Sequence, residues 1–179
     1  MAKTIMVSNN LSGTYDYQLA HVKFLNASGN EAAVENGAAV VLGEYFNNES
    51  RKATAPTATT VTGIYIIGGD VMDKKNYEPK KLSEMENAAG EIVRAYYANP
   101  TATFSITADG FDSATAANAA VGKYVTLTAN STKFTVTATE PAPAVTSNAF
   151  TPAGFYGIIR DTSRKIEGLT LYKIEVINN

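Results

Sequence analysis

Residues 35–43, with the sequence ENGAAVVLG, and residues 63–69, with the sequence GIYIIGG, decide the fold of this chain. Each is a short apolar run between glycine and polar residues, which is the pattern of a β-strand buried on both faces. Neither run contains a side chain suited to acid–base or nucleophilic chemistry. The two runs therefore predict a compact β domain whose role is binding.

Length and composition set the outer limits of this prediction. The chain has 179 residues, enough for one domain that needs no disulfide or metal to fold. It contains no cysteine and one histidine, His21, which excludes disulfides, thiolate sites and histidine-rich metal clusters. The net charge of −2 argues against a nucleic-acid partner, because such a protein would present a basic face.

No apolar run approaches the length of a membrane span, and the start of the chain lacks the layout of a signal peptide. We therefore expect no membrane partner, and we expect the protein to be made in a cytoplasm.

The start of the chain is polar, rich in turn residues and without a helical period. We interpret residues 1–19 as an extended arm with at most one short strand, and residues 20–179 as a single β domain that folds without it; a disordered start is the alternative. An extended segment can add as a strand to the edge of a partner's sheet. Because the arm is too short and polar to form its own core, we predict partner contacts at its apolar and aromatic side chains Ile5, Val7, Tyr15 and Tyr17.

The rest of the chain alternates between apolar and polar residues, which predicts a mostly antiparallel β-barrel or β-sandwich. Asn36-Gly37 suits a turn that joins the strand before it to the strand after it. The Ala/Thr/Pro-rich residues 47–62 are predicted as a loop or as a poorly ordered sheet edge. Residues 140–152, which contain three prolines, are predicted as a loop. Further strands are expected at residues 20–25, 64–67, 92–97, 103–107, 155–160 and 170–177.

A hairpin at residues 123–139 is the most specific local prediction. A turn at Asn130-Ser131 places every apolar residue opposite another apolar residue, and a slip of one position destroys this match. The apolar pairs are Leu127–Phe134 and Val125–Val136, and the pairs on the other face are Thr126–Thr135 and Tyr124–Thr137. That threonine-rich face is left for solvent or for a partner.

One short helix is predicted at residues 83–89. Ser83 and Glu86 have the spacing of a capping box, in which the serine hydroxyl accepts from the backbone N–H of residue 86. Gly90 then supplies the left-handed residue that ends a helix. A helix of about two turns is too short to be stable without packing on the sheet.

No catalytic motif is present in the sequence. There is no G-x-S-x-G elbow to position a serine nucleophile, and Gly68-Gly69-Asp70 lacks the remainder of a phosphate-binding loop. Two carboxylates alone can hydrolyse a glycoside, and sequence spacing does not exclude such a pair. The chain has no tryptophan to line a sugar cleft, however. We expect no enzyme activity, no cofactor and no metal.

The order of several motifs resembles the small capsid decoration, or cement, proteins of tailed bacteriophages, notably those that infect low-GC Gram-positive bacteria. These motifs are AVENGAAVVLGEY, RKATAP, IIGGDVM, K-x-L-S-E-M followed by AG and RAYY, AVGKYVTL, and Y-x-I-x-V. The resemblance covers residue 20 to the end of the chain, and it carries no catalytic residues. The Ala/Thr-rich residues 109–120 have no counterpart in it.

The resemblance implies a β-barrel or β-tulip domain on the outside of an assembled virion head. Such a domain would bridge subunits of the major capsid protein and form homo-oligomers, most often trimers. The alternative is a tail or baseplate β module of the same virus, or a head-fibre domain that binds the host surface. A fibre usually carries a repetitive or coiled-coil shaft, and the sequence has none.

Overall fold

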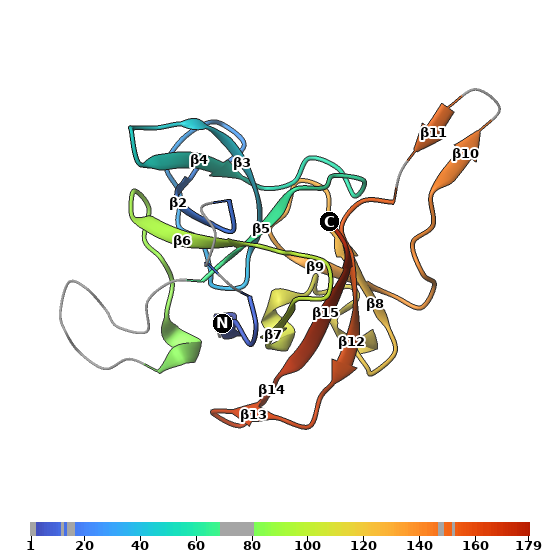
Figure 1. The fold of residues 1–179 in the computed structure, drawn as a ribbon. Helices are drawn as coiled ribbons and strands as arrows, with labels where there is room; N and C mark the ends of the chain where they lie inside the picture. The colour runs from blue at the N-terminus through green and yellow to red at the C-terminus, as the bar shows by residue number, and fades with distance from the viewer. Residues whose placement is uncertain (1–2, 12, 14–16, 69–80, 147–148, 152) are drawn as a thin grey trace.

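The computed structural model describes residues 3–11, 13, 17–68, 81–146, 149–151 and 153–179. The fold is mainly β, as predicted, and its strands form a closed barrel and a six-stranded sheet. In Figure 1 the barrel lies at the upper left and the sheet at the lower right. Within the described residues, the helical segments are single 3-10 turns at Leu82–Glu84, Ala108–Gly110 and Ala116–Asn118.

The barrel has the strand order β2-β4-β3-β5-β6. Its neighbours are antiparallel except for β2 and β4, which run parallel, with His21 beside Ser50. The strands are β2 (Leu19–Phe24), β3 (Ala39–Tyr45), β4 (Ser50–Thr54), β5 (Ile64–Ile67) and β6 (Ile92–Tyr97).

The sheet has the order β1-β7-β15-β12-β8-β9, and all its neighbours are antiparallel. Its strands are β1 (Met6–Val7), β7 (Thr103–Ile106), β8 (Tyr124–Leu127), β9 (Phe134–Thr137), β12 (Tyr156–Asp161) and β15 (Tyr172–Asn178). Two ribbons complete the fold. One, formed by β10 (Ala144–Thr146) and β11 (Ala149–Thr151), projects from the body; the other consists of β13 (Lys165–Ile166) and β14 (Leu169–Thr170) (Figure 1).

Strands β3 and β5 form a wall that is shared by two hydrophobic cores. Val40 and Ile67 belong to the core inside the barrel, whereas Ala39 and Ile66 belong to the core between the barrel and the sheet. All four side chains have no exposed surface. The predicted burial on both faces is thus confirmed, and the reason is that successive side chains of a strand point to opposite faces.

The predicted hairpin at residues 123–139 is confirmed in its register. All four predicted cross-strand pairs occur between β8 and β9, including Leu127 with Phe134. Strand β9 lies at the edge of the sheet, and a segment that precedes the hairpin in the chain protects it: the Asp112 N–H donates to the Phe134 carbonyl at 2.7 Å. The Val136 N–H donates to the Thr115 hydroxyl at 3.1 Å. Covering an edge in this way prevents unwanted strand pairing.

The predicted helix at residues 83–89 is wrong. The structure has one 3-10 turn at Leu82–Glu84, and Met85 is extended. The Ser83 hydroxyl donates to Glu167 Oε2 at 2.6 Å, and the Leu82 and Ser83 N–H groups also donate to the Glu167 carboxylate. The Ser83 hydroxyl is therefore bonded to Glu167 of the β13–β14 turn and does not accept from the backbone N–H of residue 86, as the capping box required.

Both predicted loops contain strands. Residues 47–62 include β4, in which Ser50 and Ala53 are buried, and residues 140–152 include the ribbon β10–β11. The turn at Asn36-Gly37 does not join two paired strands, because β2 pairs with β4 and β6. The sequence of β4 has no apolar alternation that would predict a strand. Its place in the barrel follows only from its pairing with β2 and β3.

The described part of the predicted arm belongs to the sheet and not to a free extension. Met6 and Val7 pair with Ile106 and Ser105 of β7. Ile5 is 2% exposed, and Leu11 is part of the core between barrel and sheet. Residues 3–11 thus add a strand to the edge of the chain's own sheet. The sequence predicted this kind of strand addition, but to the sheet of a partner.

Candidate functional site

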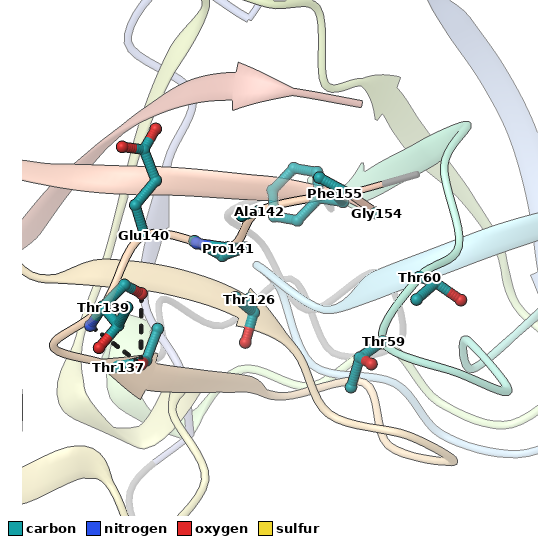
Figure 2. Close-up of a pocket in the computed structure, with 11 residues that line it drawn as sticks. Thr59, Thr60, Thr126, Thr137, Thr139, Glu140, Pro141, Ala142, Gly154 and Phe155 are labelled. Carbon is teal, nitrogen blue, oxygen red and sulfur yellow. Dashed lines mark hydrogen bonds between the residues drawn. The ribbon is translucent and has the colours of Figure 1, made fainter. Parts of the chain in front are cut away.

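A groove of about 420 Å³ opens beside the β8–β9 hairpin, on the face of the sheet that points away from the core (Figure 2). Thr126 of β8 and Thr137 of β9 form its floor, because they alternate with the buried Val125 and Val136. The groove is lined by Thr59, Thr60, Thr126, Thr137, Thr139, Glu140, Pro141, Ala142, Ala153, Gly154 and Phe155.

Gly154 allows two chain segments to meet at one wall of this groove. A Cβ atom at residue 154 would lie 2.3 Å from the carbonyl oxygen of Thr59 and 2.5 Å from the Cα of Thr60. These are backbone atoms, so a larger residue would displace the loop. Glycine is required here because the two backbones approach so closely.

The one carboxylate that lines the groove is held by tyrosines. Tyr156 donates from its hydroxyl to Glu140 Oε1 at 3.1 Å, and Tyr124 donates to Oε2 at 3.4 Å. Burial and the bond to Glu140 raise the pKa of Tyr156, so its hydroxyl stays protonated. Figure 2 shows the Glu140 carboxylate directed away from Thr126 and Thr137. The groove therefore offers hydroxyl groups for hydrogen bonding but pairs no base with a nucleophile.

Two further features of the described residues concern metal binding and membrane crossing. No group of three or more histidine, aspartate or glutamate side chains is placed to hold a metal ion among them. In that same part of the chain, no helix is long and apolar enough to cross a membrane. His21 is exposed on β2, as its place on the polar face of the strand predicts.

The three predicted partner contacts that lie within the described residues do not share one exposed surface. Ile5 is buried in the chain's own core and is not available to a partner, and Val7 is half-buried in the pairing with β7. Tyr15 lies outside the described residues. Tyr17 is 60% exposed and packs edge-on against Tyr97 with 6.5 Å between ring centroids.

Sequence reasoning missed the residues that surround Tyr17. Tyr97 also packs edge-on against Tyr65 at 5.2 Å, and the Tyr65 hydroxyl donates to the Tyr17 carbonyl at 2.7 Å. The sequence did contain a signal, because these tyrosines lie within or beside predicted strands. Only the pairing of β5 with β6 shows that they meet.

No protein-family model matches this chain, and comparisons with curated proteins and with solved structures find no similar protein.

Proposed function

We propose that this chain is a structural protein of a tailed-phage virion that binds the outside of the head and stabilises the capsid by bridging major capsid subunits. The order of sequence motifs that resembles the phage decoration proteins carries the proposal. In the structure these motifs build the framework of the fold: AVENGAAVVLGEY includes β3, IIGG includes the end of β5, and RAYY lies in β6.

The surface supports a role in protein binding. Tyr17, Tyr45 and Phe46 are between 44% and 66% exposed. Exposed aromatic side chains are enriched where proteins meet. The groove supports the same role, since its lining offers hydroxyl donors and acceptors without a catalytic pair. The partners that follow are the major capsid protein and further copies of this chain, with a trimer as the expected assembly.

The proposal is tested with particles of the phage that encodes the chain. Heads from a phage lacking the gene are mixed with purified protein, and bound protein is measured after sedimentation. We expect saturable binding to heads, electron-microscopic density on the outer surface, and greater resistance of decorated heads to osmotic shock. Density at the tail or baseplate, with bare heads, would contradict the proposal. Sedimentation of the free protein measures whether it is a trimer.

A further inference from the structure

The two ends of the barrel differ in how they are closed. The strand directions place the starts of β2, β4 and β5 and the ends of β3 and β6 at one end. Tyr17, Tyr45, Arg51, Tyr65 and Tyr97 lie at these strand termini, and we call this set the tyrosine end. Because the five strands close into a barrel, these termini surround one of its two ends (Figure 1).

The side chains of the tyrosine end form two groups of contacts. Tyr17, Tyr97 and Tyr65 make edge-on ring contacts in series. The Arg51 guanidinium lies 5.3 Å from the ring centroid of Tyr45, and its Nε and Nη2 donate to the Gly43 carbonyl at 2.9 and 2.7 Å. Burial raises the pKa of Tyr65, and the positive charge of Arg51 opposes this shift. These contacts hold the aromatic groups in place before any partner arrives.

The opposite end of the barrel is closed by the chain itself. Val34, from the segment between β2 and β3, is 5% exposed and belongs to the barrel core. It forms a bridge with Asn87, whose side-chain N–H donates to the Val34 carbonyl at 2.9 Å. No such plug covers the tyrosine end among the described residues, where Tyr17 and Tyr45 are 60% and 66% exposed.

The composition of the tyrosine end identifies the kind of partner that fits it. Tyrosine and arginine are the residues that most often dominate the energy of protein–protein contacts. Arg51, stacked on the Tyr45 ring, favours a carboxylate on the partner, because a guanidinium binds carboxylates with two parallel hydrogen bonds. Nucleic acid is a poor match, because a strand of phosphates needs several cationic side chains. Arg51 is the one cationic residue among the five that define the tyrosine end.

We infer that the tyrosine end is the surface through which this chain attaches to the protein shell. The occupant is a segment of the shell protein that presents apolar side chains around an aspartate or glutamate. This inference rests on the proposed function and adds to it the face that meets the capsid. The inference does not require the threonine-lined groove or the projecting ribbon for attachment.

The test uses full-length protein and heads that lack it. Tyr45→Ala removes the most exposed ring without disturbing a buried group, and Arg51→Glu reverses the charge that the partner carboxylate would meet. Val121→Ala is the matched control for Tyr45, since Val121 is 58% exposed in the loop before β8. Arg160→Ala is the control for Arg51, since Arg160 is an exposed arginine on the sheet that pairs with Glu175.

We expect Tyr45→Ala to weaken binding to heads by about tenfold and Arg51→Glu by more, with both controls within about twofold of wild type. Circular dichroism and the thermal midpoint establish that each variant is folded, and Tyr45→Ala keeps the test valid if Arg51→Glu unfolds. Raising the salt concentration should weaken the binding of the wild type to heads more than that of Arg51→Ala, because salt screens exposed charges.

The outcomes separate the inference from the proposed function. Wild-type protein that fails to bind heads overturns both. Wild-type binding with an unchanged affinity for Tyr45→Ala overturns the inference and leaves the proposed function standing. Loss of self-association by Tyr45→Ala, with attachment intact, assigns the tyrosine end to a second copy and likewise overturns the inference. The use of purified heads removes host saccharides, so a saccharide ligand would appear as no effect of Tyr45→Ala.

Discussion

The two cores of this molecule are built from side chains of different size. The core between barrel and sheet contains four fully buried or nearly buried phenylalanines, Phe104, Phe111, Phe134 and Phe155. The core inside the barrel consists mainly of valine and alanine, with Val22, Val34, Ala38, Val40, Ala53, Ile67, Val93 and Ala95 as its buried members. A closed barrel of few strands has a narrow interior, and the side chains must fill it.

The difference in side-chain size between the two cores explains the order of alanine and valine in the run at residues 38–41. In AAVV, Ala39 points toward the phenylalanine-rich core and Val40 points into the narrow barrel. A strand that serves two cores must match two volumes at once, and a shift of one residue exchanges them. The hydrophobic run therefore encodes a register as well as burial.

The largest expected effect lies in the sheet core. Phe134 has no exposed surface, and its ring centroid is 5.9 Å from that of Phe104 and 5.7 Å from that of Phe155. Phe134→Ala should lower the free energy of unfolding by about 3–5 kcal/mol, because it leaves a large cavity. Urea denaturation measures the change, and Phe134→Leu should cost clearly less. A loss below about 1 kcal/mol would show that the phenylalanines do not dominate this core.

The next effect tests whether the buried residue that precedes β1 contributes to the stability of the domain. Ile5 is buried, its N–H donates to the Thr107 hydroxyl at 3.1 Å, and the Thr107 N–H donates to its carbonyl at 3.1 Å. Ile5→Ala should cost about 2–4 kcal/mol in unfolding free energy. The exposed Val121→Ala should stay within about 0.5 kcal/mol. An unchanged thermal midpoint for Ile5→Ala would restore the expectation that the domain folds without its first residues.

The barrel core should respond to added volume instead. Ala53 of β4 has no exposed surface and lies opposite Leu42 across the strand pair with β3. Ala53→Leu should destabilise the protein by about 1–3 kcal/mol, because a narrow, filled interior does not accept three more carbon atoms. Ala117→Leu, at an exposed position, is the control. Full tolerance of Ala53→Leu would mean that the barrel is not packed to capacity.

The parts of the fold that sequence predicts are those whose information is local. The β8–β9 hairpin was predicted to the residue because both strands and their turn lie within one short stretch with matched apolar pairs. Strand β4 was missed because its sequence, SRKAT, has no apolar alternation and its burial comes from β2 and β3. Ser83 had the correct local signal for a cap, but Glu167 replaced the expected partner.

The candidate site follows the same division. Tyr17 was identified from composition and is exposed, whereas Ile5, identified by the same reasoning, is buried in its own sheet. Neither Arg51 nor Tyr45 was identified, because a β-bulge in the β3–β4 pair brings them together at the end of the barrel. Strand order and register, which sequence alone did not supply, decide which aromatic residues become neighbours.

The smallest expected effect concerns the hydrogen bonds between Glu167 and residues 82–83, which we call the Glu167 clasp. They join the β13–β14 turn to the segment that precedes β6. Glu167, at the β13–β14 turn, accepts hydrogen bonds from the Ser83 hydroxyl and from the Leu82 and Ser83 N–H groups. The Ser83 hydroxyl is the main reason that the pKa of Glu167 is lowered from its ordinary value of 4.5. A carboxyl with a lowered pKa stabilises the folded state above its unfolded-state pKa. That contribution is lost as the pH falls through the folded-state pKa.

Wild-type stability should therefore decline in acid below about pH 4.5, and Glu167→Gln should remove part of that decline. Ser83→Ala is the matched variant from the other side of the clasp, and it should remove a similar part because it deletes the main donor. The effect is small because the carboxylate is exposed to solvent. Thermal midpoints measured from pH 3 to pH 7 give the comparison. If both variants keep the full acid dependence of the wild type, the hydrogen bonds to Glu167 contribute nothing to the pH dependence of stability.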